Sequence, residues 1–314
     1  PDIVGMIIIP RVRRLSGALC ATVLLLVAAC SSGKDAALPQ GDCPVAPVRV
    51  TVSVDQWSDM VRTLAGDCAA VQTVVEATAT DPHEFEPTPA DSAKLTNADL
   101  VVVNGLGYDE WATKAVDTAS PRPAVVDAAT AAGRHKGDNP HVWYDPAAQR
   151  KVAVAVTTAL TKLQPGATTY LQERSAIWAR GQVPYRTAVD RASMLAKGRA
   201  YAATEPVAEY LADALAMRDL TPAGFARAAA NETEPSPGDV SELLDVLRSG
   251  KVDVLLLNSQ VQGQLNQQLV AAAKAADVAV VKITETQPPG SSDFVAWQVH
   301  QLDELSDAFE TAGR

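Results

Sequence analysis

Residues 48–75 read VRVTVSVDQWSDMVRTLAGDCAAVQTVV, and this stretch decides the fold. A strand-like apolar run at Val48–Val54 is followed by a helical pattern at Trp57–Ala65 and by a second strand-like run at Val71–Val75. Strands that alternate with helices indicate a parallel sheet, because parallel neighbours need a long crossover connection. The stretch therefore predicts an α/β fold.

The same alternation continues on both sides of a long helical segment. Residues from Ala147 to about Ala196 are Ala-rich and helical in pattern, with a break at Pro165-Gly166. Before this segment we expect a helix opened by Thr88, a strand at Leu100–Val103, a helix at Glu110–Val116 and a strand at Ala124–Val126. After it we expect strands at Ala200–Ala203, Val252–Leu257 and Val278–Ile283, and helices at Pro206–Leu215, Val240–Leu247 (started by Ser236-Pro237), Leu265–Ala275 and Phe294–Phe309.

We therefore predict two β/α lobes with parallel sheets, joined by one long backbone helix. The N-terminal lobe is expected over residues 48–164, the linking helix over 165–197 and the C-terminal lobe over 198–314. Open parallel sheets bind ligands beyond the carboxyl ends of their strands. The cleft between the lobes is thus the expected binding site.

The N-terminal segment has the pattern of an export signal. Three Arg at positions 11, 13 and 14 precede an apolar run from Ala18 to Ala29, which is too short for a confident membrane span. The run ends in Val-Ala-Ala followed by Cys30, which is typical of a bacterial lipoprotein signal. We predict a signal peptide over 1–29, a lipidated Cys30 and a tether over 30–47, on the outer face of the cytoplasmic membrane. An ordinary signal peptide and an uncleaved anchor are the alternatives.

The net charge of the whole chain is −10, and residues 1–29 contain three Arg and one Asp, so their removal leaves −12. Such an acidic chain is not expected to bind nucleic acid and favours cations as partners.

Four Cys occur in the chain, of which Cys20 and Cys30 belong to the export signal. Cys43 and Cys68 remain, and an exported chain with two Cys suggests one disulfide. They precede the first two predicted strands, whose starting ends should lie side by side. We therefore predict a Cys43–Cys68 disulfide, with two free buried thiols as the alternative.

Two of the four His stand in similar motifs, His83 in DPHEFEP (81–87) and His141 in NPHVWYDP (139–146). A His that follows Pro in a stiff loop has its direction restricted before a ligand arrives. Neutral imidazole is the commonest protein ligand for a transition metal. The motifs therefore suggest a metal site assembled from distant loops.

Two carboxylates stand at matching places in the C-terminal half. Glu205 directly follows its first predicted strand and Glu285 follows its last. Two imidazoles and two carboxylates would balance the charge of a divalent cation. Each residue also has a simpler explanation: a loop His is more often solvated, Glu205 could cap the next helix, and Glu285 could be an ordinary surface residue.

The chain resembles the metal-binding lipoproteins of bacterial zinc and manganese ABC importers. The resemblance runs across nearly all of the mature chain, in the segments DPHEFEPTPAD (81–91), NADLVVVNGLGYDEW (97–111), NPHVWYDP (139–146), ATEPVAEYLADAL (203–215), NETEPSPGDV (231–240) and KITETQPPG (282–290). It implies two β/α lobes bridged by a long helix, with the metal buried between them.

The resemblance also implies a ligand set. The family's ligands occur in the segments where this chain has His83, His141, Glu205 and Glu285. The third ligand is Glu in many manganese carriers and His in many zinc carriers, and the fourth is usually Asp rather than Glu. We expect a monomeric receptor that binds one Zn²⁺ or Mn²⁺ per chain and delivers it to an ABC permease, without enzymatic activity.

Two other classes of protein are alternatives to this receptor. A secreted zinc metallohydrolase would need an open zinc position and a general base, but the chain contains no HExxH motif. A receptor of the same fold for an organic metal chelate would need an aromatic or Arg-lined cleft. His135 and His300 are expected at the surface.

Overall fold

The computed structural model describes residues 41–76, 85–291 and 293–312. The predicted signal peptide, the lipidation site Cys30 and the ligand candidate His83 lie outside these residues. Residues from Ala36 to Arg314 form one compact unit, which contains both predicted sheets. Among the helices that the structure describes, none has the length and hydrophobicity of a membrane-spanning segment.

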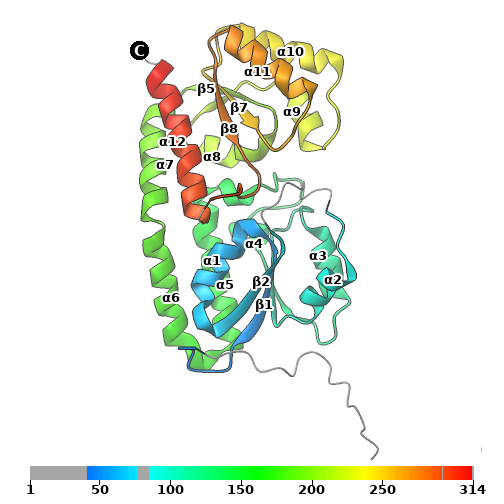
Figure 1. Ribbon diagram of the computed structural model, residues 1–314, viewed down its shortest axis with the longest axis vertical. Coiled ribbons are helices and arrows are strands. Elements are labelled where there is room, and N and C mark those ends of the chain that lie inside the picture. Colours follow the sequence, from blue (N-terminus) through cyan, green and yellow to red (C-terminus); the bar gives the residue numbers. More distant parts are fainter. Residues whose placement is uncertain (1–40, 77–84, 292, 313–314) are drawn as a thin grey trace, which may run out of the picture. The chain divides into compact units, whose positions relative to one another are not determined.

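The first sheet has four parallel strands in the order β2-β1-β3-β4. Figure 1 shows β1 and β2 side by side in this sheet. The strands are β1 (Val48–Val54), β2 (Ala69–Val75), β3 (Leu100–Val103) and β4 (Ala124–Asp127). Every residue of β3 is buried, as expected for a central strand of a sheet that is covered on both faces. The predicted α/β half is confirmed.

The described residues before position 164 form these α-helices: α1 (Ser58–Ala65), α2 (Pro89–Thr96), α3 (Glu110–Asp117), α4 (Ala128–Ala132) and α5 (Pro146–Leu163). The start of α2 is a capping box, in which Thr88 accepts from the backbone of Asp91 and Asp91 accepts from the backbone of Thr88. Asp145 caps α5, whose first residue is Pro146. These signals explain why both starts could be predicted.

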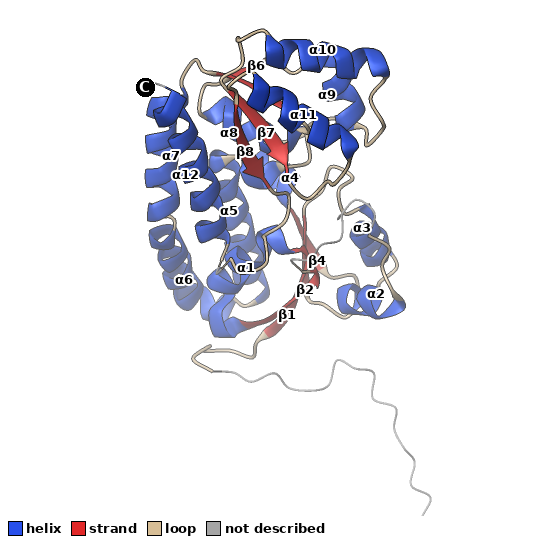
Figure 2. Ribbon diagram, turned by 45° about the horizontal axis from the view of Figure 1, so that its top comes forward, coloured by secondary structure: helices blue, strands red, loops and turns tan. Residues whose placement is uncertain are grey.

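The second sheet repeats the arrangement with parallel strands in the order β6-β5-β7-β8. Its strands are β5 (Ala200–Ala203), β6 (Arg218–Asp219), β7 (Val254–Asn258) and β8 (Ala279–Ile283), and the helices that follow them are α8 (Glu209–Ala214), α9 (Ala223–Ala230), α10 (Pro237–Arg248), α11 (Gln264–Ala275) and α12 (Phe294–Ala312). Along β5, Tyr201 and Ala203 join one hydrophobic core and Ala202 joins another, so helices cover both faces (Figure 2).

The linking helix consists of two segments, α6 (Thr168–Gly181) and α7 (Val183–Ala196), separated at Gln182. Pro184 stands in the first turn of α7 and has no N–H to continue the hydrogen-bond ladder of α6, which explains the interruption. Packing against α1 and α5 ties α6 to the first lobe, and packing against α12 ties α7 to the second. The expected long connection is present, while the lobe boundaries 48–164 and 198–314 remain predictions.

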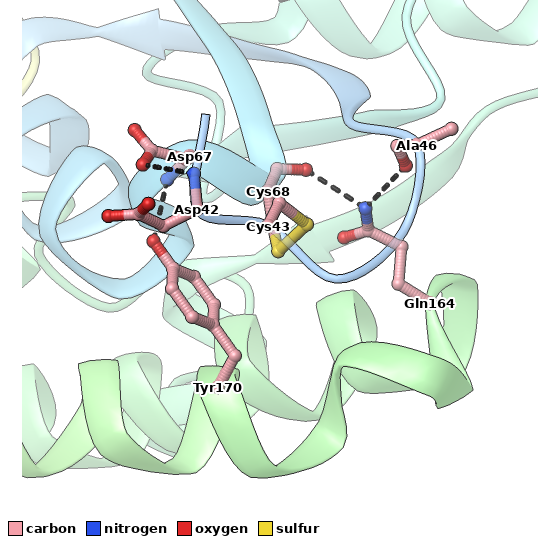
Figure 3. Close-up of a disulfide and its surroundings, with 7 residues drawn as sticks. All are labelled: Asp42, Cys43, Ala46, Asp67, Cys68, Gln164 and Tyr170. Atoms are coloured by element: carbon pink, nitrogen blue, oxygen red, sulfur yellow. Dashed lines mark hydrogen bonds between the residues drawn. A yellow bond between two sulfur atoms is a disulfide. The ribbon is translucent and has the colours of Figure 1, made fainter. Parts of the chain in front are cut away.

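A disulfide joins Cys43 to Cys68 across 25 residues, with a Cα–Cα distance of 4.9 Å (Figure 3). Val48 pairs with Ala69, so the starting ends of β1 and β2 are neighbours, as the prediction required. Gln164 donates from Nε2 to the carbonyl oxygens of Ala46 and Cys68. The predicted disulfide is confirmed, and it ties the entering chain to the sheet and to the end of α5.

Candidate metal centre

A cleft of about 1040 Å³ is lined by residues of both lobes. His141 approaches it from the first lobe, and Glu205 and Glu285 approach it from the second. Glu205 follows the end of β5, and Glu285 follows the end of β8. The carboxyl ends of parallel strands therefore carry the candidate ligands, as the topology predicts.

His141 is the best-defined candidate ligand. It is 6% exposed and stands directly before a short 3-10 helix, Val142–Tyr144. The amide of Asn104 donates to the carbonyl oxygen of Pro140 at 2.9 Å, and the ring of Trp143 lies edge-on to the imidazole, 5.2 Å between centroids. The imidazole is thus buried and held, which excludes the alternative of a solvated loop His.

The ring of His141 meets Glu285 across the cleft. His141 Nε2 lies 3.1 Å from Glu285 Oε1, and His141 Nδ1 lies 2.6 Å from the side-chain oxygen of Asn139. Because Nδ1 faces an acceptor, it carries the ring proton of the neutral imidazole, and the Nε2 lone pair then points at a carboxylate oxygen. Two such atoms need a shared proton or a cation between them. Two ligand atoms about 2.1 Å from one metal ion stand roughly 3.0–3.4 Å apart.

Glu285 is buried, with 5% of its surface exposed, so it is not an ordinary surface residue. Its backbone N–H donates to Gln260 Oε1 at 2.5 Å, and its carbonyl oxygen accepts from Gln56 Nε2 at 3.0 Å. Burial, and next the negative charge of Glu285, raise the pKa of the neighbouring Tyr108 hydroxyl well above its usual value. The Tyr108 hydroxyl therefore keeps its proton and adds no second negative charge beside Glu285.

Glu205 lines the same cleft and is half-buried. Its Oε2 accepts from the side-chain amide of Asn258, at the end of β7, at 2.7 Å. Glu205 stands before the 3-10 helix Pro206–Ala208, yet its side chain makes no capping hydrogen bond. Its side chain is therefore bonded to Asn258 rather than to the start of the following helix.

The structure brings His141 and Glu285 into contact and places Glu205 in the same cleft. Within residues 41–76, 85–291 and 293–312, no three His, Cys, Asp or Glu side chains are grouped closely enough to hold a metal ion. The full set of four remains a prediction, because His83 lies outside these residues. Asp293, the next carboxylate along the chain after Glu285, is exposed and caps α12 by accepting from the N–H of Ala296.

Sequence reasoning missed the amides that hold these ligands. Asn139, Asn258, Gln260 and Gln56 each bond a candidate ligand directly, through a side chain or the backbone. Sequence patterns could have identified two of these amides. Asn258 follows the apolar run of a predicted strand, and Asn139 begins the NPHVWYDP motif. His135 and His300 are exposed, as predicted.

Two parallel α/β lobes, bridged by a helix and with buried candidate ligands in the cleft between them, define the class of two-lobed solute-binding receptors. The family model "Zinc-uptake complex component A periplasmic" matches residues 50–308. The chain belongs to this family.

Individual relatives are similar along most of the chain. The manganese-binding lipoprotein MntA of Halalkalibacterium halodurans is 22% identical over 90% of this chain and 93% of the relative. The zinc-binding lipoprotein AdcA of Streptococcus pneumoniae is 22% identical over 96% of this chain and 62% of that protein. The Mn-bound periplasmic metal binding protein from Candidatus Liberibacter asiaticus superposes with a TM-score of 0.70 at 19% identity, over 83% of this chain and 99% of that one.

The family consists of binding receptors rather than enzymes, which removes the metallohydrolase alternative. The chain is an extracytoplasmic receptor for a divalent transition metal in an ABC importer. The structural neighbour confirms the fold of two parallel sheets with a long helix.

Proposed function

We propose that the protein captures one Zn²⁺ or Mn²⁺ with His83, His141, Glu205 and Glu285 and delivers it to the permease of its importer. The contact of 3.1 Å between His141 Nε2 and Glu285 Oε1 carries this proposal. The two atoms come from different lobes, both are buried, and their spacing suits two ligands of one ion. Two neutral imidazoles with two carboxylates would neutralise the ion inside the cleft.

We further propose that Cys30 is lipidated and that residues 30–47 tether a monomeric receptor to the membrane. The lipoprotein names of the two relatives support the anchor. No described helix offers a spanning anchor. The cargo is then captured close to the permease that accepts it.

The proposed ligands are compatible with both Zn²⁺ and Mn²⁺. One relative is named for manganese and another for zinc. Oxygen ligands such as Glu205 and Glu285 suit Mn²⁺, but affinity at a given site rises from Mn²⁺ towards Cu²⁺, with Zn²⁺ also above Mn²⁺. We propose that both ions bind and that Zn²⁺ binds more tightly, whichever is the physiological cargo.

Metal analysis of protein purified without a His tag tests the proposal, followed by calorimetric titration of the metal-free protein with Zn²⁺ and Mn²⁺. Wild-type protein should bind one ion per chain. His141→Ala and Glu285→Ala should lower affinity at least ~100-fold, because removal of a ligand leaves an incomplete site. Circular dichroism should show that both variants keep the wild-type fold.

His135→Ala is the matched control, because this exposed His lies outside the cleft lining. It should bind as wild type does. Wild-type affinity in His141→Ala would overturn the proposed site, and wild-type affinity in Glu285→Ala alone would remove that residue from the ligand set.

A further inference from the structure

Asn139, two residues before His141, uses all four hydrogen-bonding positions of its side-chain amide. Its Oδ1 accepts the backbone N–H of His141 at 2.9 Å and lies 2.6 Å from His141 Nδ1. Its Nδ2 donates to the carbonyl oxygen of Pro206 at 2.7 Å and to Glu209 Oε2 at 2.6 Å. Because the oxygen faces a backbone donor and the nitrogen faces two acceptors, the orientation of the amide is fixed.

This arrangement determines which nitrogen of the neutral His141 ring carries the proton. The proton lies on Nδ1, where Asn139 accepts it, and Nε2 presents its lone pair to the cleft. The carboxylate of Glu209 polarises the amide from the other side, and hydrogen bonds in such a chain strengthen one another. In a ligating imidazole, one ring nitrogen binds the metal and the other carries the N–H. The group that accepts this N–H orients the ring and raises its basicity.

The same chain of bonds connects the two lobes. Asn139 lies in the loop before α5, whereas Glu209 is the first residue of α8 in the second lobe. The Tyr210 hydroxyl donates to the carbonyl oxygen of Asn139 at 2.8 Å, and the guanidinium of Arg134 stacks 3.9 Å from the Tyr210 ring. The loop that carries His141 is therefore attached to the segment that carries Glu205.

We propose that Asn139 and Glu209 are positioning residues of the metal site. Resting on the proposed role of His141 as a ligand, the inference is that Glu209 acts through Asn139 to fix the ring of His141 and to hold it in register with Glu205. The pair makes the ligand geometry depend on contact between the lobes at this point. A movement that separates α8 from the His141 loop would loosen His141 before any ligand itself is altered.

Three variants test the pair by calorimetric zinc titration with a competing chelator. Asn139→Asp keeps an acceptor for His141 but replaces the donor with a carboxylate that faces Glu209. Glu209→Gln keeps the size of the side chain and removes its charge. In the double variant Asn139→Asp/Glu209→Gln, the new Gln amide can donate to the new Asp, which restores one bond in reverse. Glu242→Gln, an exposed Glu on α10, is the control.

Loss of a partner that orients a metal ligand lowers affinity about 10–100-fold. Asn139→Asp keeps the acceptor, but it sets two carboxylates against each other and leaves the Pro206 carbonyl without its donor, so we expect the His141 ring to be displaced and affinity to fall in this range. Glu209→Gln should lose affinity by at least about threefold, the double variant should bind better than Asn139→Asp, and Glu242→Gln should match wild type. In the zinc-loaded protein, NMR should show the His141 ring N–H exchanging faster with water in Glu209→Gln.

Wild-type affinity and unchanged ring exchange in Glu209→Gln, or a double variant no better than Asn139→Asp, would overturn the inference. The His141→Ala titration distinguishes this failure from that of the metal site itself. If His141→Ala loses zinc while Glu209→Gln does not, the site stands and the positioning role falls.

Discussion

Asp55, at the end of β1, is a buried carboxyl group at the contact between the lobes. Its Oδ2 accepts the backbone N–H of Gln287 at 3.3 Å, two residues beyond Glu285. Its Oδ1 is buried without a hydrogen-bond partner among the described residues. Burial is the main cause that raises the pKa of Asp55 from 3.8 to about 7, with a smaller contribution from the charge of Asp59.

This shift makes stability depend on pH in a defined direction. Between pH 3.8 and about 7, the folded protein holds a proton on Asp55 that the unfolded chain releases. The contribution of the protonated Asp55 to the free energy of unfolding is therefore complete below pH 3.8 and is lost as pH rises towards about 7. Because Asn does not ionise, Asp55→Asn should not lose stability as pH rises. At pH 8 its free energy of unfolding should exceed that of wild type by up to about 4 kcal/mol. Urea denaturation of metal-free protein at pH 5 and pH 8 measures this. An Asp55→Asn variant with the same pH dependence as wild type would contradict it, and Asp117→Asn at the exposed surface is the control.

At the scale of elements, the disulfide is the feature that local patterns predicted best. It closes a loop of 25 residues between the entering chain and β2, and it is surrounded by bonds from Gln164 and Tyr170 (Figure 3). In the chain-entropy account, such a bridge stabilises the fold by restricting the unfolded chain.

Replacing both cysteines, Cys43→Ala/Cys68→Ala, should lower the free energy of unfolding by roughly 3 kcal/mol. Zinc affinity should remain at its wild-type value, because the bridge lies at the starting ends of the strands and the cleft lies at their carboxyl ends. Denaturant unfolding and zinc titration check the two statements. Stability equal to wild type would show that the bridge adds nothing beyond the bonds around it.

Sequence patterns did not predict β6, α4, the eight-residue helix α9 or the interruption of the linking helix. β6 has two residues and α4 has five, too few for a hydrophobic period to appear. The interruption at Gln182 is hidden in a long Ala-rich helical run, although Pro184 marks it. The capping boxes at Thr88 and Ser236 did identify helix starts, because their bonds are local.

The candidate site likewise contains residues that the sequence identified and residues that it did not. His141 and Glu285 could be singled out as candidates because each follows a strand of its own parallel sheet, at the end where such sheets bind ligands, and because the family resemblance points to the same segments. The role of Asn139 could not, because its partners Pro206 and Glu209 are brought to it only by the packing of one lobe on the other. Pairing across lobes depends on tertiary placement that no local pattern contains.

At the scale of the whole molecule, the two lobes are joined by more than the linking helix. α7 packs along α12, and bonds cross between the lobes at Gln56 with Glu285, Asp59 with Phe294 and Tyr144 with Thr284. A wide opening would break all of these together. The lobes should therefore move by small tilts when the metal enters or leaves.

Small-angle scattering of metal-free and zinc-loaded protein tests this expectation. The radius of gyration should change by less than about 1 Å, since packed helices move by small shear rather than by wide hinge closure. The His141→Ala variant with added zinc serves as the control. A compaction of several ångströms on loading would show instead that these bonds form only in the closed protein.

The spread of the proposed ligands along the chain has a consequence for biosynthesis. His141 and Glu285 are 144 residues apart, on different lobes. Closing so long a loop in an unfolded chain is unfavourable, so the two side chains meet only when both lobes have folded. A chain that is still being synthesised or exported therefore has no competent site. If the chain is exported before it folds, it leaves the cell's own metal behind and begins to collect cargo only in the compartment where it completes its fold.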